Sequence, residues 1–175
     1  WTFLSRKALL NEYASRVPAT RSAEDSYFLT CSLLAARRIA CVDIPLYQYL
    51  VHEESLSETR NPYRYLDKIK SFDLLMEFAR KRGFYEANRE ELDYIYLKKG
   101  HILGILTYIY NEEHPQVITV CKLHNHLLEY IPEYKNNPYY HADRKLRLLH
   151  TLIRQGLHLA FKVLPWYIRK SGMRL

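Results

Sequence analysis

Residues 64–83 read RYLDKIKSFDLLMEFARKRG, and the spacing of their apolar residues decides the fold class. These residues recur every three or four positions, which is the period of one face of a helix; they are Tyr65, Ile69, Phe72, Leu75, Met76 and Ala79. Gly83 follows them where a helix commonly ends in a left-handed glycine. The stretch therefore predicts an α-helix that begins after Pro62 and stops at Gly83.

The same helical period continues towards the C-terminus. Further helices are expected from about Glu90 to Tyr110, from Pro115 to about Tyr130, and from Arg144 to about Val163. Helix-breaking residues separate the last two of these helices, namely Pro132 and Asn136-Asn137-Pro138. Asp143 is a suitable N-cap for the last helix, because its carboxylate can accept from a free backbone N–H. The C-terminal two thirds of the chain is therefore predicted to be a helical bundle.

The pattern before Pro62 is mixed. A short helix is expected between Phe3 and Tyr13, and a second one runs to Arg38 from a capping-box spacing, Ser22 to Asp25. Ile39–Ile44 is short and β-branched, as a buried strand would be, and Leu46–His52 is either a second strand or its continuation after Pro45. The predicted fold class is mainly α, with a short β segment followed by the helical bundle.

Composition limits the class of protein. The chain has 175 residues and 48% hydrophobic residues, which suits one ordinary globular domain, or a piece of one with an appendage. Its three cysteines lack paired spacing, so neither a disulfide framework nor a zinc knuckle is predicted, and a reducing compartment is expected. The first residues do not have the form of a signal peptide, and no apolar run approaches the roughly 20 residues needed to span a bilayer.

The net charge of +7 comes from the C-terminal tail. Residues 144–175 contain eight Lys or Arg and no Asp or Glu. Such a tail, with apolar residues on one helix face, can lie on an anionic membrane surface or can be an ordinary basic packing helix. Lys98 and Lys99 lie among tyrosines without an RNA-binding motif, so no nucleic-acid partner is expected.

One series of short motifs points to a family. In order, these are Trp1-Thr2-Phe3-Leu4-Ser5-Arg6-Lys7-Ala8-Leu9-Leu10, Ala23-Glu24-Asp25, Pro45-Leu46-Tyr47-Gln48-Tyr49, and His52 followed by Ser55 and Ser57. Their order and spacing resemble the second half of the catalytic domain in bacterial family 2 glycosyltransferases of the GT-A fold. The resemblance covers about Trp1 to Thr59. It implies two domains, residues 1–60 from the GT-A-like domain and residues 61–175 as a helical accessory domain.

The resemblance also implies roles for individual residues. Asp25 matches the carboxylate that, in inverting members, deprotonates an acceptor hydroxyl as it attacks a nucleotide sugar. Glu24 is expected to support it, and His52 matches a histidine that helps to hold a metal. Ser55 and Ser57 would contact the acceptor or the phosphates. The acceptor class is a hydroxyl of a cell-envelope saccharide, lipid-linked or similar.

The cofactor implied for the full-length enzyme is divalent Mg or Mn. The metal-binding Asp-x-Asp motif and the nucleotide-binding segment precede Trp1 in the family pattern, so this fragment is expected to be inactive alone and to bind no metal. Relatives often have arginine where this chain has Leu50, and Glu91-Leu92-Asp93 imitates Asp-x-Asp only inside a helical pattern. The implied location is the cytoplasm, at the inner face of the membrane, and oligomeric state is left open.

Other interpretations of the same residues remain. Taken alone, Glu24-Asp25 is an ordinary acidic first turn of a helix. The histidines at positions 124, 126, 150 and 158 are expected to be surface or satisfied core residues, because positions i and i+2 of a helix point to different faces. The competing function is a non-catalytic helical interaction module with a basic tail that binds a membrane or a partner.

Overall fold

The computed structural model describes residues 5–14, 23–45, 48, 63–155 and 170. These residues are mainly helical, and none of them forms a β-strand. The helices are α1 Lys7–Ala14, α2 Glu24–Ala35, α3 Arg64–Lys81, the 3-10 turn η1 Glu86–Asn88, α4 Arg89–Ile95, the π-helix η2 Tyr96–Ile102, α5 Leu103–Asn111, α6 Val117–Tyr130, the 3-10 turn η3 Tyr134–Asn136, α7 Pro138–Ala142 and α8 Arg144–Arg154. The mainly α class and the helical bundle are confirmed.

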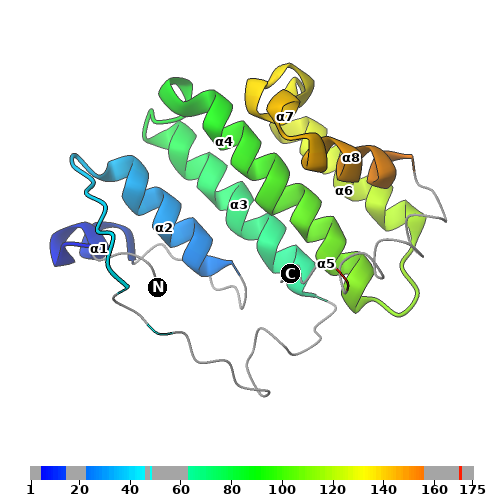
Figure 1. Cartoon of the computed structure of the whole chain (residues 1–175), viewed down its shortest axis with the longest axis horizontal. Helices are drawn as coiled ribbons and strands as arrows, with labels where there is room; N and C mark the ends of the chain where they lie inside the picture. Colours follow the sequence, from blue (N-terminus) through cyan, green and yellow to red (C-terminus); the bar gives the residue numbers. More distant parts are fainter. Residues whose placement is uncertain (1–4, 15–22, 46–47, 49–62, 156–169, 171–175) are drawn as a thin grey trace.

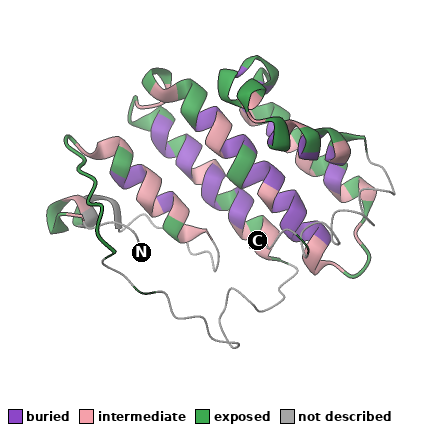
Figure 2. Ribbon diagram, in the orientation of Figure 1, coloured by how far each residue is buried: buried purple, intermediate pink, exposed green. Residues whose placement is uncertain are grey.

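The helices form a bundle around α3 and the long helix that α4, η2 and α5 make together. α2 packs against one side of α3, and the long helix packs against the other. α6 and α8 contact η2 and each other, beyond the long helix (Figure 1). Buried residues gather on the facing sides of α3 and the long helix (Figure 2). Tyr27 and Cys31 of α2 belong to the same hydrophobic core as these two helices.

α3 ends as its sequence predicts. Gly83 adopts φ 72°, a left-handed conformation in which glycine is not strained. The Phe84 N–H then donates to Ala79 O at 2.8 Å, and the Phe84 ring lies 6.0 Å from the Phe78 ring. This backbone bond and hydrophobic contact are typical of a glycine-terminated helix.

The helix expected from Glu90 to Tyr110 is present, but it contains a π turn. The Leu103 N–H donates to Lys98 O, which is the i to i−5 bond of a π-helix, and α5 continues directly from η2. Periodicity alone does not predict this insertion, because the apolar spacing on both sides remains helical.

Two glycines let the long helix approach α3 closely. A Cβ placed on Gly100 would lie 2.8 Å from Phe72 Cβ, a distance that real Cβ contacts do not reach. One turn later, a Cβ on Gly104 would lie 3.2 Å from Ile69 Cγ1. Glycine is therefore required by packing at Gly100, although it is a poor helix former.

α8 is capped by the predicted residue. Asp143 Oδ1 accepts from the Leu146 N–H at 2.9 Å, and its Oδ2 accepts from Tyr94 Oη at 2.8 Å and Lys98 Nζ at 3.0 Å. Burial opposes ionisation of this carboxyl, but these donors outweigh it and lower the pKa of Asp143 to about 2. The cap thus also ties α8 to the long helix.

The apolar face of α8 is packed in the bundle. Leu146, Leu149 and Ile153 are buried. Over these residues α8 is a basic packing helix, while the continuation predicted to Val163 falls mostly on residues 156–169, outside the described residues. No helix among the described residues is both long enough and apolar enough to cross a membrane.

Two local predictions before Pro62 are wrong. Residues 36–45 form neither helix nor strand, and the side chains of Ile39, Val42 and Ile44 are 62–63% exposed. A β-branched run becomes a buried strand only when other strands pair with its backbone, and no described residue does so. The N-cap of α2 is Ala23 rather than Ser22, without a side-chain hydrogen bond. The second strand segment, Leu46–His52, lies almost wholly outside the described residues.

Replacing Gly100 by alanine should test the close approach of the two helices. We expect Gly100→Ala to lower the free energy of unfolding by about 1–3 kcal/mol, because the added methyl forces Phe72 or a backbone to move. Gly104→Ala is the matched control and should cost clearly less, since its nearest neighbour, Ile69 Cγ1, lies at 3.2 Å and has to give way by only a few tenths of an ångström. Urea denaturation measures both. Equal stability of Gly100→Ala and the unmodified chain would contradict the packing described here.

The Asp143 cap makes a second prediction. We expect Asp143→Ala to lower the free energy of unfolding by about 1–2 kcal/mol, because it removes the acceptor of the Leu146 N–H. Asp143→Asn keeps that acceptor and should lose less. Denaturation curves of the two variants at neutral pH would reveal the difference, and identical losses would mean that the cap bond contributes nothing.

Candidate functional site

The predicted catalytic pair lies in the first turn of α2, where the backbone is unusual. Ala23 precedes Glu24 with φ 67° and ψ 11°, and it is the one described non-glycine residue with positive φ. The left-handed conformation costs an alanine about 1–2 kcal/mol, and such strain clusters at functional sites. The Tyr27 N–H donates to Ala23 O at 3.1 Å, so the turn itself is hydrogen-bonded.

Asp25 and Glu24 differ in their surroundings. The Asp25 side chain is exposed, and its Oδ1 accepts from the Ser26 N–H at 2.7 Å. A substrate can reach this carboxylate from the exposed side, and the helix N-terminus favours a negative charge there. Glu24 is half-buried, and its Oε2 is buried without a hydrogen-bond partner among the described residues. Buried polar atoms are normally paired, so this oxygen lacks the donor that such an atom usually has.

A buried lysine on α3 lies close enough to Asp25 to interact with its charge. Lys68 is 7% exposed, and its Nζ donates to Thr107 Oγ1 at 3.0 Å. Desolvation and, to a smaller extent, the Arg64 charge lower the pKa of Lys68 to about 8, while the Asp25 carboxylate opposes this shift. No sequence motif includes Lys68, because it stands inside a helical stripe. Lys68 is therefore a buried cation that interacts electrostatically with the predicted base.

The remaining predicted site residues are not placed. His52, Ser55 and Ser57 lie outside the described residues. Their association with Asp25 stays a prediction of the family pattern.

A shallow cavity of about 300 Å³ opens between α2 and α4. Its lining is mainly apolar, from Leu33 and Leu34 on α2 to Leu92 and Ile95 on α4. It lies towards the C-terminal half of α2, away from Asp25. Glu91, at its edge, accepts from Tyr139 Oη at 2.7 Å, so this carboxylate already serves helix packing.

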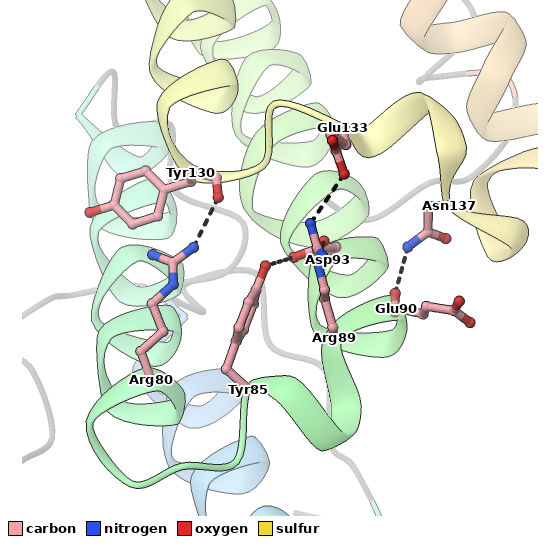
Figure 3. A network of polar contacts seen from close by, with 8 residues as sticks. All are labelled: Arg80, Tyr85, Arg89, Glu90, Asp93, Tyr130, Glu133 and Asn137. Atoms are coloured by element: carbon pink, nitrogen blue, oxygen red, sulfur yellow. Dashed lines mark hydrogen bonds and ion pairs between the residues drawn. The ribbon is translucent and has the colours of Figure 1, made fainter.

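The Glu91-Leu92-Asp93 sequence, which imitates a metal-binding Asp-x-Asp, belongs to α4. Asp93 Oδ1 accepts from Tyr85 Oη at 2.8 Å, and its other oxygen lies 3.8 Å from Arg89 Nε (Figure 3). Arg89 also contacts Glu133, while Arg80 donates to Tyr130 O, so the network joins α3 and α4 to the segment after α6 (Figure 3). This carboxylate pair is structural.

His126 also has a structural partner. Its Nε2 lies 3.0 Å from Asp73 Oδ2, and Tyr96 Oη donates to Asp73 Oδ1 at 2.7 Å. Desolvation raises the pKa of Asp73, and the contacts with Tyr96 and His126 partly oppose this rise. The pair ties α6 to α3 and the long helix.

Three other histidines form a second polar cluster, which no sequence motif predicts. They are His101 on η2, His124 on α6 and His150 on α8, and their ring centroids lie 5.5–6.0 Å apart. His101 and His150 are buried, and His124 is half-buried. No predicted motif includes His101, and the three are too far apart in the chain to form a spacing motif. Only the packing of the three helices brings them together.

Comparison with protein family models, with curated protein sequences and with solved structures finds no match to this chain.

Proposed function

We propose that this chain is the C-terminal part of an inverting, family 2-like glycosyltransferase, in which Asp25 is the general base. The observation that carries the proposal is an exposed carboxylate on a strained helix start. The motif series around Glu24-Asp25 supports it. Residues 1–60 would belong to the catalytic domain, and residues 61–175 would form its helical accessory domain.

The proposed reaction needs a positioned proton acceptor. An alcohol is a poor nucleophile until its proton is taken, so Asp25 would accept the proton of the acceptor hydroxyl. The hydroxyl oxygen forms a bond to the anomeric carbon while the bond from that carbon to the diphosphate breaks. The nucleoside diphosphate leaves with the bonding electrons. The acceptor class remains a saccharide hydroxyl of the cell envelope.

Lys68 and Glu24 would support Asp25 without touching the substrate. The Lys68 ammonium on α3 interacts electrostatically with the Asp25 carboxylate. Glu24 keeps one buried oxygen free for a donor from the rest of the catalytic domain.

The described residues do not supply a set of oxygen ligands for the divalent Mg or Mn of the family. Mg²⁺ prefers oxygen ligands, and the one cluster of three or more candidate ligands among the described residues consists of histidines. The proposed metal role of His52, and those of Ser55 and Ser57, rest on the family pattern alone. An Asp-x-Asp sequence within about a hundred codons upstream of Trp1 in the gene is the first test, and its absence would remove the enzyme proposal.

Asp25→Asn in the full-length protein tests the base directly. We expect turnover to fall by about 10²–10⁴-fold, because amide nitrogen and oxygen cannot take the proton. Binding of the nucleotide sugar should change less than about twofold. Turnover is measured as the release of nucleoside diphosphate from a panel of UDP, GDP and dTDP sugars with a saccharide acceptor. Calorimetry measures the binding of the nucleotide sugar.

Glu77→Gln is the matched control for this experiment. Glu77 is an exposed carboxylate on α3 that forms only a 3.8 Å ion pair with Lys81, so its loss should leave turnover unchanged. Normal turnover of Asp25→Asn would refute the assignment of the base.

Lys68→Met separates the stability effect of the buried lysine from its role beside Asp25. Because the folded-state pKa is about 8 and the ordinary value is 10.5, the unfolded chain holds more protons between these pH values. The stability of the unmodified chain should therefore rise from pH 8 to pH 10.5. Lys68→Met should lack this rise and be more stable at pH 7, by about 1–3 kcal/mol. Thr107 Oγ1 stays satisfied, since it donates to Leu103 O at 2.7 Å.

Turnover tests whether Lys68 also acts at the site. If its charge supports the reaction, turnover of Lys68→Met in the full-length protein should fall below that of the unmodified chain, although the variant is more stable. Turnover assays paired with urea denaturation give both results. Unchanged turnover would remove Lys68 from the site but leave Asp25 untouched.

A further inference from the structure

We propose that His101, His124 and His150 form a binding site for a first-row transition metal ion of the Zn²⁺ type, which ties together η2, α6 and α8. The inference does not depend on the proposed transferase function. It concerns other helices and a different ligand chemistry from the Mg or Mn of the family pattern.

The geometry of the three side chains suits one shared ion. One ring nitrogen of each histidine lies within 4.8 Å of the others. Ligand nitrogens at about 2.0–2.1 Å from a tetrahedral Zn²⁺ are separated by about 3.4 Å. Small rotations of the rings would therefore close the site around an ion.

Each of the three rings has a buried nitrogen without a hydrogen-bond partner among the described residues. These atoms are His101 Nε2, His124 Nδ1 and His150 Nε2. A single buried unpaired nitrogen is uncommon, and three in one cluster demand a shared explanation. A metal ion satisfies all three at once, because each neutral imidazole offers one lone pair.

The surroundings keep the histidines in the form that binds metal. Desolvation, followed by the charges of His150 and His124, lowers the pKa of His101 well below its ordinary range. Desolvation and the nearby His124, Arg154 and Lys135 lower the pKa of His150 to about 4. Desolvation likewise lowers the pKa of His124. Neutral imidazole is the metal-binding form, so no proton has to leave at neutral pH.

Contacts around the cluster orient its rings. Tyr140 Oη lies 3.2 Å from His150 Nδ1, so this nitrogen can carry its hydrogen and donate to the tyrosine while Nε2 faces the ion. Such outer contacts are typical of histidine ligands. The buried Tyr134 ring covers the cluster at 5.0 Å from the His150 ring. His101 also stands in the π turn, and π turns are frequent at functional sites.

The ligand set narrows the choice of ion. Imidazole suits Zn²⁺, Co²⁺, Ni²⁺ and Cu²⁺, whereas Mg²⁺ and Ca²⁺ prefer oxygen. Among the residues that the structure describes, no carboxylate joins the three histidines as a candidate ligand, and the charges of Lys135 and Arg154 act on the cluster. A fourth ligand would therefore be water, hydroxide or another anion. The half-buried His124 marks the side from which that ligand can enter.

Metal binding to the full chain, free of any affinity tag, tests the proposal. After treatment with a chelator and its removal, we expect one Zn²⁺ or Co²⁺ per chain. Bound Co²⁺ should give the intense visible absorption of a low-coordinate nitrogen site, and Zn²⁺ should abolish it. Zn²⁺ should also raise the thermal midpoint of unfolding, because it binds only the folded arrangement.

Variants assign the site. His124→Gln should weaken binding by more than the roughly 10–100-fold caused by loss of an outer contact, and Tyr140→Phe should weaken it within that range. His114→Gln is the matched control, since this histidine is exposed, and it should bind normally. Because His124 is half-buried, its variant should keep the helical circular dichroism spectrum even if His101→Gln or His150→Gln fails to fold.

Two results would overturn the metal site. One is equal Co²⁺ binding by the unmodified chain, His124→Gln and His114→Gln, which would assign the ion to surface groups. The other is a folded chain that binds neither ion, which would leave a buried water as the partner of the three nitrogens.

Discussion

The close approach of the long helix Arg89–Asn111 to α3 is the contact on which the rest of the structure depends. Gly100 offers only a hydrogen where a Cβ would come within 2.8 Å of Phe72. The two helices can then bury Leu75, Met76, Ile105 and Leu106 almost completely between them and their neighbours. Because successive residues of a helix are turned by about a quarter of a circle, His101 does not point where Gly100 does, and it faces α6 and α8 instead.

Both candidate sites place polar groups where apolar ones would be more stabilising. Lys68 is buried with one hydroxyl partner, and each of the three clustered histidines has a buried nitrogen without a hydrogen-bond partner among the described residues. Burying such groups disfavours folding unless they are paired, so stability alone does not explain them. By contrast, the Asp73, Asp93 and Asp143 carboxylates all have donors that join helices. The unpaired histidine nitrogens and the buried Lys68 charge are therefore the better functional candidates.

Sequence reasoning succeeded where structure is local. The stripe from Tyr65 to Ala79, the stop at Gly83 and the Asp143 cap depend on neighbours within about one turn, and all three are present. It failed at Ile39–Ile44, because a strand is defined by partners elsewhere. The π turn and Lys68 also escaped it, since neither changes the helical period. The histidine cluster could not be found from spacing, because it exists only once η2, α6 and α8 have packed.

The two proposals make different demands on the chain and can fail separately. Asp25 would act on a proton at the start of α2, and its loss should show in turnover rather than in the stability of the bundle. The histidines join three helices, so a bound ion should act first on the stability of that part. Nor can one ion serve both roles, because a diphosphate recruits a hard cation with oxygen ligands, whereas three imidazoles select a softer one. A protein that held both would therefore carry two metals with separate functions.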